Sequence, residues 1–140
     1  EMSANKITKK LVSVINNDFY DVIIVNYANA DMVGHTGKLN AALKAVNTVD
    51  SCVKQVVEAV KKQNGTTIIA ADHGNCEEMI EPKTNKVCTS HSLNPVYCTI
   101  VSQNVKRLRD GVLADIAPTL LEILKIKKPK QMTGKSLIMG

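Results

Sequence analysis

Aromatic residues are scarce in this chain of 140 residues: they make up 3% of it, and tryptophan is absent. A hydrophobic core must therefore be aliphatic, built from valine, isoleucine, leucine and alanine. No apolar run is long enough to span a bilayer, and no signal-peptide pattern opens the sequence, so we expect a cytoplasmic protein with no membrane partner. Because the first residue is Glu1 and not methionine, we expect the natural protein to begin further upstream.

Paired cysteine motifs are also missing. The four cysteines form no C-x-x-C pair, which favours reduced thiols over a disulfide framework. One alternative is a zinc site, since His73 and Cys76 have H-x-x-C spacing. A zinc knuckle needs a second ligand pair of this kind, and the sequence offers none.

The net charge of +5 comes mostly from lysine, with a basic cluster near the C-terminal end of the chain. This cluster contains Lys125, Lys127, Lys128 and Lys130. It has neither interleaved aromatics nor a nucleic-acid-binding motif, so we expect no nucleic-acid partner. We interpret it as a solvated face, and a small anionic substrate fits the charge equally well.

Apolar patterning predicts alternating helices and strands. Helices are expected over 3–15, 39–62 and 113–124, and strands over 22–25, 66–71 and 96–101. In the long helix, the apolar residues at three- and four-residue steps are Leu39, Leu43, Val46, Val49, Val53, Val56, Val57 and Val60, and Asn64-Gly65 is a usual stop signal after it. The β-branched run 22–25 is typical of a strand buried on both faces. This order predicts one α/β domain, a three-layer sandwich with a mostly parallel sheet.

The chain has only three histidines, and each lies in a short polar motif. Asp31 and His35 follow the first predicted strand, Asp72 and His73 follow the second, and His91 lies on the loop before the third. Carboxylate and neutral imidazole are suitable ligands for Mn²⁺, Zn²⁺ or Co²⁺. Hydrogen-bonded loop histidines are the simpler alternative for each motif alone. Taken together, the motifs favour a metal site at one end of the sheet.

Five segments closely resemble the signatures of cofactor-independent phosphoglycerate mutase, a family of the alkaline phosphatase superfamily. They are NYANADMVGHTG (26–37), ADHGN (71–75), HSLNPV (91–96), LADIAPT (113–119) and MTGKSL (132–137). The resemblance covers the whole chain, in order. It implies an alkaline-phosphatase-like but incomplete fold, in which residues 1–140 form the C-terminal portion of the metal-binding phosphatase domain.

The resemblance also implies two divalent metal ions, Mn²⁺ foremost with Zn²⁺ or Co²⁺ as alternatives, and no bisphosphoglycerate. Asp31, His35 and His91 correspond to the ligands of one ion, and Asp72 and His73 to ligands of the other. In the family, an aspartate and the nucleophilic serine complete the second set. Both lie outside this chain, which therefore has no catalytic residue of its own.

The implied activity is the interconversion of 3-phosphoglycerate and 2-phosphoglycerate through a phosphoserine intermediate. The implied partners are phosphoglycerate and the missing N-terminal part of the same protein, without which we expect no activity. A phosphopentomutase or phosphatase of the same superfamily would use similar ligands, although the long first motif argues against both. A non-catalytic module for metal binding or protein interaction is a further alternative.

Overall fold

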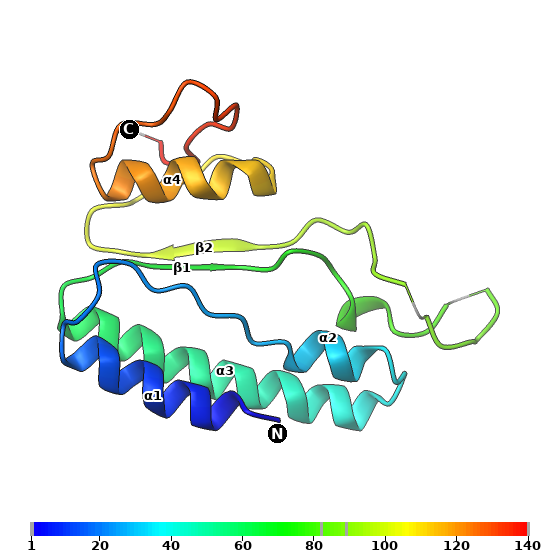
Figure 1. Ribbon diagram of the computed structural model, residues 1–140. Helices are drawn as coiled ribbons and strands as arrows, with labels where there is room; N and C mark the ends of the chain where they lie inside the picture. Colours follow the sequence, from blue (N-terminus) through cyan, green and yellow to red (C-terminus); the bar gives the residue numbers. More distant parts are fainter. Residues whose placement is uncertain (1, 82, 89, 140) are drawn as a thin grey trace.

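The structure, a computed structural model, describes residues 2–81, 83–88 and 90–139. Within these residues, two strands and four α-helices form the regular structure, together with two short 3-10 helices (Figure 1). In chain order they are α1 (Ala4–Asn16), α2 (Asn29–Gly34), α3 (Leu39–Lys62), β1 (Thr67–Ala70), η1 (Cys76–Glu78), β2 (Cys98–Val101), η2 (Leu113–Asp115) and α4 (Ile116–Ile123).

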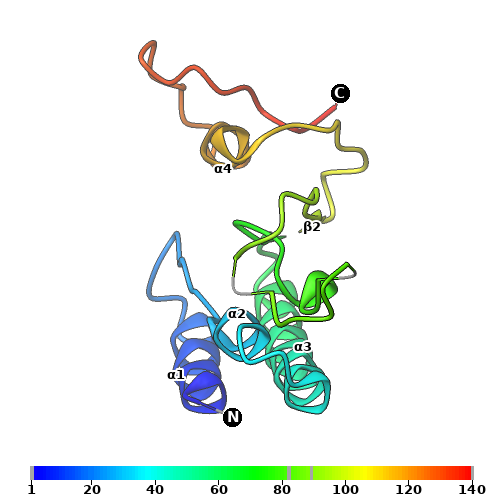
Figure 2. The same ribbon diagram turned by 90° about the vertical axis from the view of Figure 1, so that its right-hand side faces the viewer.

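The two strands lie between helices, with α1 and α3 on one side and α4 on the other (Figures 1 and 2). The fold is therefore of the α/β class. The helix predicted over 39–62 is confirmed at both bounds. It stops as expected, because Asn64 takes a left-handed conformation and the N–H of Gly65 donates to the carbonyl of Val60 at 2.9 Å.

The main core lies between α1 and α3, where Leu11, Ile15, Val56 and Ala59 form a buried cluster. The buried face of α3 differs in part from the apolar repeat in its sequence. Leu39 and Leu43 are more than half exposed, and the buried stripe is Ala42, Ala45, Cys52, Val56 and Ala59. Helices α1 and α2 both pack on α3, so tertiary packing and not hydrophobicity alone selects the buried face.

The prediction of a mostly parallel sheet is wrong for the strands that the structure describes. β1 and β2 pair antiparallel, with Thr67 opposite Val101 and Ala70 opposite Cys98. The physical reason is the connection: a parallel pair needs a crossover, usually through a helix, whereas an antiparallel pair does not. Between β1 and β2 the described residues form only η1 and loops.

The strand predicted over 22–25 is absent from the described structure. These residues are extended but lie in no ladder, and the side chain of Ile24 is 87% exposed. A strand needs a backbone partner as well as apolar side chains, and no described segment supplies one. The segment is anchored at its end, where the Tyr27 and Thr8 hydroxyls hydrogen-bond at 2.7 Å.

Two other elements differ from expectation. No helix was expected between 15 and 39, but α2 lies there, over Asn29–Gly34. The helix predicted over 113–124 is divided into η2 and α4. Within the described residues, no helix has the length and apolar character needed to cross a membrane.

Candidate metal centre

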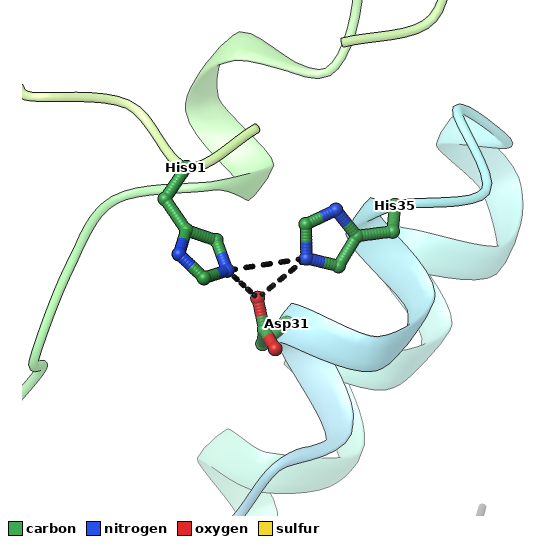
Figure 3. Close-up of side chains that lie close together, drawn as sticks. All are labelled: Asp31, His35 and His91. Carbon is green, nitrogen blue, oxygen red and sulfur yellow. Dashed lines mark hydrogen bonds and ion pairs between the residues drawn. The ribbon is translucent and has the colours of Figure 1, made fainter. Parts of the chain in front are cut away.

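Asp31, His35 and His91 bring one oxygen and two nitrogen atoms to a single point (Figure 3). The Asp31 Oδ1 atom lies 3.1 Å from His35 Nε2 and 3.2 Å from His91 Nε2. The two Nε2 atoms lie 3.2 Å from each other. Among the residues described, no other group of three His, Cys, Asp or Glu side chains is arranged to hold an ion.

Helix α2 places the first two of these side chains. Asp31 lies in its first turn and His35 is its C-cap residue, so the i,i+4 spacing puts both on one face. The N–H of His35 donates to the Asp31 carbonyl at 3.3 Å. A single helical turn is therefore enough to bring the two side chains together.

His91 arrives from the opposite side, and the antiparallel sheet explains how. Because Ala70 pairs with Cys98, the C-terminal end of β1 and the N-terminal end of β2 lie at the same end of the sheet. His73 follows β1 and His91 precedes β2, and their rings stack at 3.6 Å between centroids. A β-bridge between Gly74 and Ser92 holds the two segments together.

These distances fit a common ion. Ligand atoms bound at about 2.0–2.2 Å in tetrahedral or octahedral geometry lie about 2.8–3.6 Å apart. The three separations at the centre, 3.1, 3.2 and 3.2 Å, fall in that range. One carboxylate with two imidazoles also suits Mn²⁺, Zn²⁺ or Co²⁺ chemically. The donor set therefore fits a divalent cation.

Asn75 also belongs to the centre, although its role was not predicted. Its side-chain N–H₂ donates to Asp31 Oδ1 at 2.9 Å and lies 3.2 Å from His35 Nε2. It thus places partial positive charge against the same lone pairs that a cation would bind. Gly34 makes room for it, since a Cβ atom there would lie 1.9 Å from Asn75 Oδ1. The signal in the sequence was its position in the ADHGN segment.

Asp72 and His73, the second predicted ligand pair, lie further apart than the ligand atoms of the first group. Asp72 Oδ1 lies 3.6 Å from His73 Nε2, and the Asp72 side chain is 80% exposed. Within the described residues they form no group of three ligands. Since a metal site with only two protein ligands is incomplete, this pair needs further ligands to hold an ion.

The thiol of Cys76, the alternative ligand, is poorly suited to bind a metal ion. It donates to the Ala30 carbonyl, with 3.1 Å between the Sγ and oxygen atoms. Burial raises the pKa of the Cys76 thiol, and the carboxylates of Glu77 and Asp31 raise it further. The thiolate that a metal requires is therefore disfavoured.

One buried atom at the centre has no partner among the described residues. The Nδ1 atom of His35 lies within the protein without a hydrogen bond. Histidines that bind metals usually donate this second N–H to a carboxylate, carbonyl or water, which fixes the ring. His35 thus has its Nε2 atom in the cluster and its other nitrogen open to such a partner.

Residues 1–128 match the metalloenzyme superfamily, and the chain belongs to it. Its curated relatives include two enzymes named 2,3-bisphosphoglycerate-independent phosphoglycerate mutase. The one from Methanosarcina acetivorans is 53% identical over 99% of this chain, and the one from Clostridium botulinum (strain ATCC 19397) is 52% identical over 99%. The chain spans 27% of the length of each.

A solved structure agrees with these relatives. A crystal structure of Leishmania mexicana phosphoglycerate mutase at low cobalt concentration matches with a TM-score of 0.86 and 31% identity. The match covers 98% of this chain and 28% of that one. The similarity to phosphoglycerate mutases in the sequence analysis is confirmed, and the chain corresponds to about a quarter of such an enzyme.

Proposed function

We propose that this chain supplies metal ligands to a phosphoglycerate mutase that interconverts 3-phosphoglycerate and 2-phosphoglycerate without bisphosphoglycerate. The convergence of Asp31, His35 and His91 on one point carries the proposal. It is supported by relatives of that name with more than half of their aligned residues identical. Phosphoglycerate is then the substrate, and a phosphoserine is the intermediate.

In this proposal, Asp31, His35 and His91 hold one divalent ion, while Asp72 and His73 contribute to a second. Such ions supply positive charge that stabilises a phosphoryl group in transfer. This chain's own residues orient the ligands: α2 aligns Asp31 with His35, and the stack on His73 sets the ring plane of His91. We propose Mn²⁺ as the natural ion, with Co²⁺ and Zn²⁺ able to replace it.

The nucleophilic serine and the residues that grip the substrate are proposed to lie in the rest of a longer protein. Residues 1–140 would then be the C-terminal portion of its metal-binding phosphatase domain. A cytoplasmic location belongs to the same proposal, since a glycolytic substrate and four free cysteines suit a reducing compartment.

Metal binding tests the ligand assignment directly. Isothermal titration of the chain with Mn²⁺ should give one site that Asp31→Asn weakens by about 100-fold, because a carboxylate ligand is lost. Asp50→Asn is the matched control, since it removes the same charge from an exposed position on α3. It should leave this site within about twofold. Equal effects of the two changes would contradict the assignment of Asp31.

Activity tests the enzyme assignment. The isolated chain should convert no phosphoglycerate at any Mn²⁺ concentration, because it lacks a nucleophile. In the longer protein, His35→Ala should lower kcat by at least about 100-fold, since the ion would be misplaced. An enzyme-coupled assay for 2-phosphoglycerate measures both. Turnover by the isolated chain, or full activity of the His35→Ala enzyme, would refute the proposal.

A further inference from the structure

His91 depends on contacts outside its own loop for its position. It lies in the long loop between η1 and β2, and its side chain is 47% exposed. The β-bridge between Ile80 and Val87 closes a hairpin within that loop but involves none of the three candidate metal ligands. The β-bridge between Gly74 and Ser92 joins the His91 segment to the segment that follows β1, and a side-chain contact beside it joins the same two segments.

Glu77 makes that contact with both of its carboxylate oxygens. Oε2 accepts the backbone N–H of Asn75 at 2.8 Å, within its own segment. Oε1 accepts the Ser92 hydroxyl and, at 3.2 Å, the side-chain N–H₂ of Asn94. These hydrogen bonds, that from Ser92 foremost, lower the pKa of Glu77 to about 2, so the carboxylate is ionised at neutral pH.

Gly74 packs closely against the Glu77 carboxylate and the Ser92 hydroxyl. A Cβ atom on Gly74 would lie 2.2 Å from both Glu77 Oε1 and Ser92 Oγ. The N–H of Ser92 donates to the Gly74 carbonyl at 3.1 Å. Side-chain and backbone bonds thus join the same two segments, one carrying His73 and Asn75, the other His91.

We propose that Glu77 is a positioning residue for the metal centre, which it serves by holding the His91 segment against the Asn75 segment. The inference rests on the proposed metal site. Among the described residues, Glu77 forms no hydrogen bond with Asp31, His35 or His91. It acts through Ser92, the neighbour of His91. It also acts through Asn75, which donates to Asp31 and lies against His35.

The chemistry requires a carboxylate. All three groups that face Glu77 donate hydrogen bonds: a backbone N–H, a hydroxyl and an amide N–H₂. Glutamine has the same shape, but one end is itself a donor. In Glu77→Gln, the amide nitrogen would face either the backbone N–H of Asn75 or the side-chain N–H₂ of Asn94, both of which only donate. One of the present hydrogen bonds would therefore be lost, and the contact between the segments would weaken.

The test is a Co²⁺ titration of the 140-residue chain followed by visible absorption, which reports both affinity and ligand geometry. Glu77→Gln should weaken Co²⁺ binding about tenfold and change the ligand-field bands, because His91 would no longer be held in place. Glu78→Gln is the matched control. Glu78 carries the same charge one residue away, and among the described residues its carboxylate accepts a hydrogen bond only from Asn94, at 3.4 Å. It should leave affinity within about twofold and the bands unchanged.

A second variant tests the route of the effect. Ser92→Ala removes the partner across the segments and should reproduce the loss seen for Glu77→Gln. The double variant should lose no more than either single one, since both remove one contact. Circular dichroism melts distinguish a general loss of folding, which would change the helical signal without metal.

Each outcome is decisive. Wild-type binding that Asp31→Asn removes but Glu77→Gln leaves unchanged would overturn the role of Glu77 while keeping the metal site. Additive losses in the double variant would overturn the shared contact. A wild-type chain that bound no Co²⁺ would remove the metal site, and the role of Glu77 with it.

Discussion

Gly34 shows how the candidate centre depends on a single missing side chain. It lies in α2, where alanine usually stabilises a helix by about 1 kcal/mol relative to glycine. A Cβ atom at Gly34 would also lie 2.9 Å from Asn75 Cγ and 3.1 Å from Cys76 Sγ, besides its contact with Asn75 Oδ1. Steric conflict at this point therefore outweighs helix propensity.

We expect Gly34→Ala to destabilise the chain by about 1–3 kcal/mol, the usual cost of overpacking, instead of stabilising it. Asn75 would also be displaced from Asp31, so Mn²⁺ affinity should change with it. Urea denaturation and metal titration measure the two effects. Asn40→Ala, at an exposed site of α3, is the control and should have the opposite sign. A more stable Gly34→Ala chain would show that Asn75 has room to move.

At the level of helices and strands, the buried hydrophobic cluster lies where α1 packs on α3. Leu11 lies in it, 8% exposed, against Val56 and Ala59. Leu11→Ala should cost about 2–4 kcal/mol, because removing a buried isobutyl group leaves a cavity. Ile7→Ala on the same helix, where the side chain is 38% exposed, should cost clearly less. Urea denaturation midpoints of the two variants decide it, and equal costs would place the core elsewhere.

The junction between η2, α4 and the C-terminal segment depends on Asp115. Its carboxylate accepts the N–H of Lys135 at 2.8 Å and that of Val112 at 3.2 Å, and pairs with Arg109 at 3.1 Å. These bonds, that from Lys135 foremost, lower the pKa of Asp115 from its usual value of 3.8. The carboxylate is thus part of the structure only while it is ionised.

A lowered folded-state pKa has a defined sign for stability. The contribution of Asp115 is complete above pH 3.8 and is lost as the pH falls through the lower folded-state pKa. Asp115→Asn should therefore destabilise the chain at pH 7 and reduce its loss of stability between pH 4 and pH 2. Melting temperatures over this range measure both effects. Asp110→Asn, an exposed neighbour, should leave the acid profile as in the wild type.

For the whole molecule, the most unusual surface is the extended apolar segment before α2. Val22, Ile23 and Val25 are each more than a third exposed, and Ile24 is almost fully exposed. In Figure 1 the segment runs from the end of α1 to α2, and its backbone pairs with no described strand. Unpaired, apolar, extended backbone is a template for association.

We therefore expect the isolated chain to self-associate. Light scattering over a concentration series should give an apparent mass that rises with concentration. Ile24→Lys should reduce this rise, because a charge on the segment opposes pairing. Gln55→Lys, a charge of the same sign on exposed α3 surface, is the control and should change little. A strictly monomeric wild-type chain would show that the segment is protected in solution.

Local patterns were enough to predict some parts of this protein. The bounds of α3 follow from a continuous apolar period and a stop signal, which act within a few residues. The i,i+4 relation of Asp31 and His35 is equally local, since one helical turn sets it. The similarity to mutases followed from short motifs in order.

Tertiary structure decided what depends on distant segments. Strand direction followed from the register of β1 with β2, and the state of 22–25 from the lack of a described partner. The roles of Asn75 and Glu77 exist only because the His91 segment folds back against them. A hydrogen bond or a ladder needs two groups, and the sequence around one group does not determine where the other lies.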